Sequence, residues 1–304
     1  MKKIIGLFLM FALCGHFSHG QMNLSLHHDE VADEPIGTNL TIKTARLPNG
    51  VYLQYAEQGI FTGTAVIFLH GIGDSWHSFE PVLKALPENI HAFAVSLRGH
   101  GDSEKPATGY TINHFATDVD QFIKVKELKS VYVVGHSMGG MVAQQFVLDH
   151  PQLTKGMVLI DSDANFNDNP GMPGFFQQAL KLDGPIDRKF MDEFQRTTLA
   201  KPIDPDYYNL LVSEGMKVPA GVFKSSFAGM MQADFRDELK NIKVPALIFW
   251  GNKDNICSIK DEEQLLRDIP HAKFMIYENT GHALHWEEPA RFTNALTSFI
   301  KSIH

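Results

Sequence analysis

Hydrophobic and polar positions alternate along this chain in blocks that predict strands and helices in turn. Short continuous apolar runs are typical of strands that are buried on both faces of a parallel sheet. A Pro48-Asn49-Gly50 turn signal between the first two runs predicts a hairpin. The expected strands are residues 40–45, 51–57, 64–69, 91–96, 131–134, 157–160, 246–250 and 273–277.

Segments with helical periodicity follow several of these strands. After residue 137, for example, Val142, Phe146 and Val147 recur at the spacing of one helix face. The expected helices are residues 112–125, 138–149, 261–269 and 289–301. This alternation indicates an α/β fold with a mostly parallel, doubly wound sheet and helices on both faces.

The alternation is interrupted between residues 163 and 240. This interval has no strand signal, repeated prolines and a high content of phenylalanine and methionine. We interpret it as a helical cap inserted into a core of residues 40–162 and 241–304. Such a cap would lie over the carboxyl ends of the strands, where open α/β sheets bind ligands.

The N-terminus has the features of an export signal. Lys2 and Lys3 precede an apolar run that ends at Leu13 and is too short to span a bilayer. We expect residues 1–20 to be a signal peptide, residues 21–39 to be a mobile leader, and the mature protein to be periplasmic or secreted without a membrane span. Lipoprotein anchoring at Cys14 is the alternative, although Leu13 is bulky where that cleavage usually has a small residue.

Composition narrows the classes of partner. The chain has 304 residues, enough for a large core, and a formal charge of −8. Because no basic surface is indicated, we expect no nucleic-acid partner. The adjacent His27 and His28 lack any partner spacing for a metal, so no metal site is expected. Cleavage before residue 21 would leave Cys257 without a disulfide partner, and we interpret Cys257 as structural.

Ser137 is the candidate nucleophile. It lies at the centre of Gly135-His-Ser-Met-Gly139, between an expected strand and an expected helix. A turn that sharp needs glycine on both sides and holds the serine hydroxyl away from the sheet. An incidental serine in a glycine-rich turn is the alternative, and the surrounding strand and helix favour the nucleophile.

Two further strand ends carry a candidate acid and base. Asp254 follows the strand at 246–250, and His282 follows the strand at 273–277. The chain order Ser, Asp, His is the order that a nucleophile elbow requires. His282 would accept the serine proton, and Asp254 would orient the imidazole. His285 is the competing histidine; the fallback acids are Asp161 and Asp163.

The same edge of the sheet should hold an oxyanion site and a substrate pocket. We expect the backbone N–H groups of Ile72 and Met138 to stabilise the oxyanion, because one lies in a glycine-rich loop and the other follows the nucleophile. The candidate pocket residues are Trp76, His136, Phe227 and His285. Trp76 could equally belong to the core. We expect Arg98 and Asp102 to form structural polar contacts.

Together these motifs resemble the α/β-hydrolase superfamily over residues 40–304. The likeness rests on His70-Gly-x-Gly, Arg98-Gly-His-Gly-x-Ser103, Gly135-His-Ser-Met-Gly-Gly140, Gly251-Asn-Lys-Asp254 and Gly281-His282. The segments that begin at His70 and Gly281 look like a bacterial branch of esterases and lactonases. The resemblance implies a serine hydrolase with a helical cap and no cofactor. Haloalkane dehalogenases and epoxide hydrolases of this superfamily have an aspartate nucleophile in place of Ser137.

We therefore expect hydrolysis of a small or medium, hydrophobic carboxylic ester or lactone through an acyl-serine intermediate. Hydrolysis of a carbon–carbon bond and perhydrolysis by the same residues are alternatives. A ligand receptor built on a hydrolase fold is an alternative from another class. The sequence predicts neither the physiological substrate nor an oligomeric state.

Overall fold

An eight-stranded sheet forms the centre of the protein. The structure is a computed structural model that describes residues 40–169 and 172–303. The strand order is β1-β2-β4-β3-β5-β6-β7-β8. Strand β2 is antiparallel to both β1 and β4, and every other pair is parallel. The strands are β1 (Thr41–Arg46), β2 (Tyr52–Gln58), β3 (Thr64–Leu69), β4 (Ile90–Val95), β5 (Val131–His136), β6 (Thr154–Ile160), β7 (Ala246–Gly251) and β8 (Lys273–Tyr277).

The central strands are buried on both faces, which explains their continuous apolar runs. Successive side chains of a strand point to opposite faces. In β3, Val66 and Phe68 accordingly join one hydrophobic cluster, and Ile67 and Leu69 join the other. The doubly wound sheet expected from the sequence is therefore confirmed.

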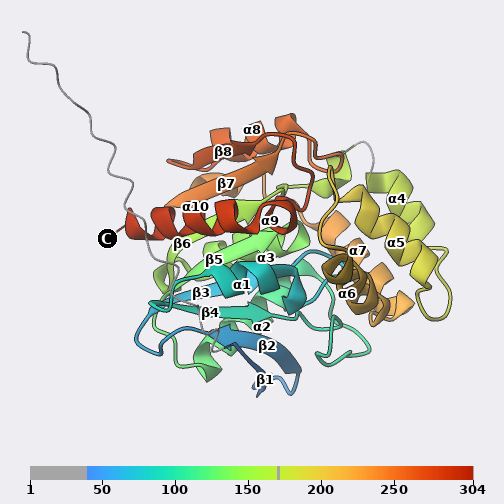
Figure 1. Ribbon diagram of the computed structural model, residues 1–304, viewed down its shortest axis with the longest axis horizontal. Helices are drawn as coiled ribbons and strands as arrows, with labels where there is room; N and C mark the ends of the chain where they lie inside the picture. Colours follow the sequence, from blue (N-terminus) through green and yellow to red (C-terminus); the bar gives the residue numbers. More distant parts are fainter. Residues whose placement is uncertain (1–39, 170–171, 304) are drawn as a thin grey trace, which may run out of the picture. The chain divides into compact units, whose positions relative to one another are not determined.

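Helices cover both faces of this sheet. In Figure 1, α1 (Glu80–Ala85) and α10 (Pro289–Lys301) lie in front of the strands. Their apolar residues pack in the same cluster as Val66 and Phe68. The opposite cluster contains residues of α2 (Ile112–Val125), α3 (Met138–Asp149) and α8 (Ile259–Asp268).

A helical insertion separates β6 from β7. It consists of α4 (Met172–Ala179), α5 (Arg188–Thr197), α6 (Pro205–Met216) and α7 (Ala220–Gln232), with short 3₁₀ turns at Phe166–Asp168 and Leu239–Asn241. Figure 1 shows these helices gathered beside one end of the strands. Aromatic rings hold them together: Phe175 stacks on Phe194 with ring centroids 5.3 Å apart, and Phe223 meets Phe194 edge-on. The expected cap limits, residues 163 and 240, stay a prediction.

Short elements complete the described chain. The 3₁₀ turns Trp76–Phe79 and Pro151–Leu153 precede α1 and β6, and α9 (Leu284–Glu287) precedes α10. The sequence reading missed α9 because four residues are too few to show a helical period. The expected signal peptide and leader, residues 1–39, lie outside the described residues.

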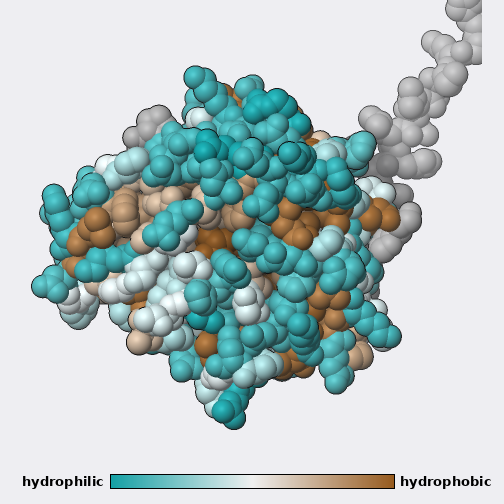
Figure 2. Space-filling model, turned by 180° about the vertical axis from the view of Figure 1, so that it is seen from behind, coloured by the Kyte–Doolittle hydropathy of each residue, from teal (hydrophilic) through white to brown (hydrophobic). Residues whose placement is uncertain are grey.

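Hydrophobic side chains gather in the interior more than on the surface. The face seen in Figure 2 is mainly hydrophilic, with hydrophobic residues scattered over it. Edge strands carry some of the exposed apolar side chains, such as Ile42 in β1 and Ile276 in β8. Among the described residues, no helix combines the length and apolar character needed to cross a membrane.

Arg98 and Asp102 make different kinds of contact, although both lie in the loop after β4. The Arg98 guanidinium donates two hydrogen bonds of 2.5 Å to the carboxylate of Asp118 on α2, and both side chains are buried. Asp102 is exposed and pairs with Lys217 at 2.9 Å. The buried pair therefore fixes α2 to the loop, whereas the exposed pair is open to solvent screening.

We predict that Asp118→Asn lowers the free energy of unfolding by about 3–5 kcal/mol, because it leaves a buried guanidinium without a counter-charge. The matched change Asp102→Asn should cost less than about 1 kcal/mol, since it removes an exposed pair. Urea unfolding of the two variants beside the wild type measures both values. Equal losses would contradict a special role for the buried pair.

Candidate active site

Ser137 occupies a strained turn between β5 and α3. Its φ of 52° and ψ of −120° place a non-glycine residue in a region that L-amino acids rarely adopt. A Cβ on Gly135 would lie 2.2 Å from the Gly139 carbonyl oxygen, and a Cβ on Gly139 would lie 2.1 Å from that of Leu69. Both glycines are therefore required by close backbone packing, and the turn they permit holds Ser137 at the carboxyl end of β5.

His282 and Asp254 are joined by a hydrogen bond. His282 Nδ1 lies 2.8 Å from Asp254 Oδ2, and the two side chains are 3% and 0% exposed. Asp254 Oδ1 accepts the backbone N–H groups of Ile256 and Cys257 at 2.7 and 3.1 Å. These amides fix the carboxylate, which in turn orients the imidazole. Because His282 and Ser137 line the same cavity, the structure brings the three candidates to one place.

The competing histidine and acids are engaged elsewhere. His285 Nε2 lies 3.1 Å from Ser78 Oγ, and its ring stacks on Phe79. Asp161 Oδ1 accepts the N–H of Gly251 at 2.8 Å, and Asp163 Oδ1 accepts that of Asn165 at 3.2 Å. Of the three carboxylates considered, Asp254 is the one that contacts His282.

Two buried acids near Asp254, Asp161 and Glu262, have raised pKa values. Burial, followed by the nearby negative charge of Asp254, raises the pKa of Asp161 well above its ordinary value. Burial also raises the pKa of Glu262, again with a contribution from Asp254. Protons on Asp161 and Glu262 relieve the repulsion that several buried carboxylates would otherwise exert on one another.

The two candidate oxyanion donors flank Ser137. Ile72 lies in the loop after β3 and lines the cavity. Met138 is the first residue of α3, so no carbonyl four residues earlier in that helix can accept its N–H. The positive end of the helix dipole points the same way. The placement is therefore compatible with the expected role of both amides.

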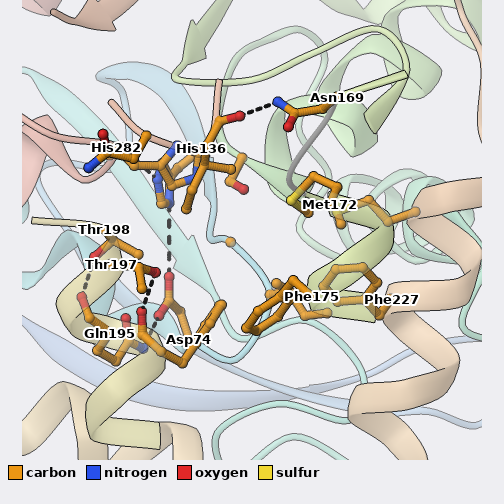
Figure 3. Close-up of a pocket in the computed structure, with 17 residues that line it drawn as sticks. Asp74, His136, Asn169, Met172, Phe175, Gln195, Thr197, Thr198, Phe227 and His282 are labelled. Carbon is orange, nitrogen blue, oxygen red and sulfur yellow. Dashed lines mark hydrogen bonds and ion pairs between the residues drawn. The ribbon is translucent and has the colours of Figure 1, made fainter. Parts of the chain in front are cut away.

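A cavity of about 240 Å³ lies between the sheet and the helical insertion. Figure 3 shows Met172, Phe175 and Phe227 on one side, and Asp74, Gln195, Thr197 and Thr198 together on another. The full lining is Gly71, Ile72, Asp74, His136, Ser137, Asn169, Met172, Phe175, Phe194, Gln195, Thr197, Thr198, Phe227, Met230, Asn255, Ile256 and His282. The candidate nucleophile and base thus open onto a chamber that is apolar on one side and polar on the other.

The pocket residues expected from the sequence divide into two groups. His136 and Phe227 line the cavity. Trp76 and His285 do not, which corrects the expectation for them. Trp76 is 2% exposed and packs in the core cluster that contains α1 and α10, because its 3₁₀ turn lies against β2, β3 and β4. His285 is held behind the site by Ser78.

Asp74 and Gln195 are cavity residues that the sequence analysis missed. Gln195 Nε2 donates to Asp74 Oδ1 at 2.9 Å, and Asp74 Oδ2 lies 3.9 Å from His136 Nδ1. Burial raises the pKa of Asp74 from 3.8 to about 7, against the opposing hydrogen bonds from Gln195 and Gly71. Its place directly after the His70-Gly-x-Gly motif could have indicated Asp74. No pattern marked Gln195, because it lies on one face of an otherwise ordinary amphipathic helix.

Asp254, Cys257 and His282 also have metal-ligand atoms within 4.8 Å of one another. The arrangement suits a hydrogen bond better than a metal. His282 Nδ1 is already directed at Asp254, and burial raises the pKa of the Cys257 thiol well above its ordinary value. A protonated thiol is a poor ligand, so we assign no metal to this group.

We predict that Asp74→Asn gains stability relative to the wild type as the pH rises. The unfolded chain releases the Asp74 proton near its ordinary pKa of 3.8, whereas the folded chain retains it to about 7. Wild-type stability therefore falls across this window, with each pKa unit corresponding to about 1.4 kcal/mol, and the asparagine variant lacks that loss. Urea unfolding at about pH 5 and about pH 8 measures the difference.

Asp237→Asn is the matched control, because Asp237 is exposed. Its stability difference from the wild type should be the same at both pH values. A constant difference for Asp74→Asn as well would contradict the raised pKa.

Comparison with known proteins places these observations in a family. Residues 64–289 match the model of the α/β hydrolase fold. The chain is 29% identical to AB hydrolase superfamily protein YisY of Bacillus subtilis over 255 residues, covering 79% of this chain and 92% of that protein. It is 26% identical to Lipase 1 of Psychrobacter immobilis over 254 residues, covering 81% and 79% of the two chains.

A solved structure has the same architecture. The esterase EaEST from Exiguobacterium antarcticum superposes with a TM-score of 0.78 at 23% identity, covering 86% of this chain and all of that one (100%). At this identity the likeness concerns the fold. With the family match over residues 64–289, it confirms the resemblance drawn from the motifs. The chain belongs to the α/β-hydrolase family.

Proposed function

We propose that this hydrolase cleaves small or medium carboxylic esters or lactones with an apolar part, through an acyl intermediate on Ser137. The observation that carries the proposal is the 2.8 Å contact between His282 and Asp254 beside a cavity that Ser137 and His282 both line. A histidine oriented by a carboxylate is the device that converts a serine hydroxyl into a nucleophile.

In the first half-reaction, His282 accepts the proton of Ser137 as the hydroxyl oxygen bonds to the substrate carbonyl carbon. The carbonyl oxygen becomes an oxyanion, which the N–H groups of Ile72 and Met138 stabilise. The bond to the alcohol oxygen then breaks, and His282 returns its proton to that oxygen. Asp254 holds the imidazole orientation and stabilises its cationic form.

In the second half-reaction, water replaces the alcohol. His282 accepts a proton from the water as its oxygen bonds to the acyl carbon. The bond to Ser137 breaks, the serine regains a proton from His282, and the carboxylic acid leaves. For a lactone the alcohol and the acid are two ends of one product, so the same steps open the ring.

The cavity supports the choice of substrate class. About 240 Å³ is below the usual range for sites of drug-sized ligands, about 300–1,000 Å³, which favours short acyl and alcohol parts. Met172, Phe175, Phe227 and Met230 supply an apolar wall. The similar Psychrobacter protein is named a lipase, which is also an ester-cleaving activity.

We predict that Ser137→Ala lowers kcat for p-nitrophenyl butanoate by at least about 10⁴-fold, because no nucleophile is left to form the acyl intermediate. Release of p-nitrophenol measures it. A fluorophosphonate probe should label the wild type at Ser137 and leave the variant unlabelled. Labelling at a different serine would refute the proposed nucleophile, and ligand-induced stabilisation without turnover would favour a receptor.

A second prediction tests whether Asp254 or Asp161 is the acid that orients His282. Asp254→Asn should reduce kcat by about 10³–10⁴-fold, since the asparagine favours the wrong imidazole tautomer. Asp161→Asn is the matched control and should cost far less, because the amide resembles the protonated carboxyl of Asp161 and can still accept the Gly251 N–H. Steady-state kinetics on the same ester decide between them. If Asp161→Asn caused the larger loss, the acid would be Asp161.

A further inference from the structure

The polar side of the cavity contains buried atoms that lack hydrogen-bond partners. Asp74, His136 and Gln195 are 3%, 2% and 0% exposed, and all three line the cavity. Within the described residues, His136 Nδ1 and Gln195 Oε1 have no hydrogen-bond partner. Because buried polar atoms in folded proteins are nearly always paired, two orphaned atoms in one binding cavity indicate that a ligand completes them.

The existing hydrogen bonds determine what kind of ligand fits. His136 Nε2 lies 3.0 Å from the carbonyl oxygen of His282. A carbonyl only accepts, so Nε2 carries the hydrogen. Burial lowers the pKa of His136 well below its ordinary value and leaves one hydrogen on the ring. His136 Nδ1 is therefore a bare acceptor.

Hydrogen bonds within the protein also use the donors of the neighbouring side chains. Gln195 Nε2 donates to Asp74 Oδ1 at 2.9 Å, and the amide oxygen Oε1 of Gln195 is left without a hydrogen-bond partner in the described part of the chain. The hydroxyl of Thr198 donates to the backbone carbonyl oxygen of Gln195 at 2.7 Å. Asp74 retains its proton up to about pH 7 and is an acceptor above it. Above that pH the hydrogens of these side chains are used within the protein, and what they leave for a ligand are acceptors.

An acceptor-lined subsite selects for a donor. A substrate carbonyl or ether oxygen placed here would meet only lone pairs, and an alkyl group would leave the buried acceptors unpaired. A hydroxyl or amide N–H would satisfy them. The opposite side of the cavity, with Phe175 and Phe227, takes an apolar chain (Figure 3).

We propose that Asp74, His136 and Gln195 form a subsite for a hydrogen-bond donor of the substrate. The substrate class is then esters or lactones that carry a hydroxyl or amide N–H beside a short apolar chain. This inference rests on the proposed ester hydrolysis at Ser137, and it adds the group that the cavity selects.

Isosteric esters test the subsite directly on the full chain at about pH 8, where Asp74 is ionised. p-Nitrophenyl 3-hydroxybutanoate and 3-methylbutanoate differ by a hydroxyl in place of a methyl group on the acyl side. 2-Hydroxypropyl and 2-methylpropyl butanoate make the same exchange on the alcohol side. We expect kcat/KM to be about tenfold higher for the hydroxyl member of at least one pair. p-Nitrophenyl 3-methoxybutanoate, which accepts but does not donate, should show no such gain.

Two variants connect the preference to the subsite. Asp74→Asn would keep the contact with Gln195 and turn an N–H toward His136 Nδ1, so it replaces an acceptor with a donor. Gln195→Met removes the acceptor Oε1 at similar size. Either change should reduce the hydroxyl-to-methyl ratio of kcat/KM to about one, because it removes the acceptors that select the hydroxyl. The exposed Asp237→Asn should leave that ratio as in the wild type.

The outcomes distinguish this inference from the function on which it rests. Turnover of both members of each pair at equal kcat/KM, abolished in Ser137→Ala, would retain the ester hydrolase and overturn the donor subsite. A hydroxyl preference that survives in both Asp74→Asn and Gln195→Met would also overturn it. No turnover of any ester, with no labelling of Ser137, would instead be a failure of the proposed function.

Discussion

The turn at Ser137 is the constraint on which the site depends. Backbone atoms approach so closely there that Gly135 and Gly139 have no room for a Cβ. The contact of Gly139 with the Leu69 carbonyl presses the start of α3 against the end of β3. That approach brings the Met138 amide and the loop containing Ile72 to the same place. A positive φ at Ser137 is the conformational cost of the arrangement.

Charge is distributed around this turn so that one carboxylate meets the imidazole. Asp254 receives two backbone N–H groups and contacts His282. Asp161 and Glu262 lie close behind, and burial raises the pKa of both. Neutral neighbours cost less to bury than additional charges. The site therefore contains several acidic residues, while its negative charge is concentrated beside His282.

The cavity derives its two-sided character from two sources. The loop after β3 contributes Asp74 and the end of strand β5 contributes His136, whereas the insertion contributes Gln195 together with the aromatic wall. Neither source forms the chamber alone, because the Gln195 side chain hydrogen-bonds to Asp74 across the two. The shape and polarity of the cavity thus depend on how the insertion packs over the strands.

The sequence by itself determined the strand–helix order and the order of the candidate residues. Continuous apolar runs have a direct physical cause, burial on both faces, and Gly135 and Gly139 have a steric one. Each of these signals is local in the chain. Ser137, Asp254 and His282 could be identified from the sequence in the same way, because each follows a strand whose end could be located from its hydrophobic pattern.

Only the tertiary structure decided which residues surround that set. Its neighbours in the chain left open whether Trp76 belongs to the core or to the pocket, and the packing of its 3₁₀ turn against β2, β3 and β4 made it core. His285 is three residues from His282, yet its hydrogen bond to Ser78 turns it away. Asp74 and Gln195 lie 121 positions apart, and no local periodicity could pair them. Long-range contacts of this kind arise from the docking of the insertion on the sheet, which leaves no trace in the hydrophobic pattern.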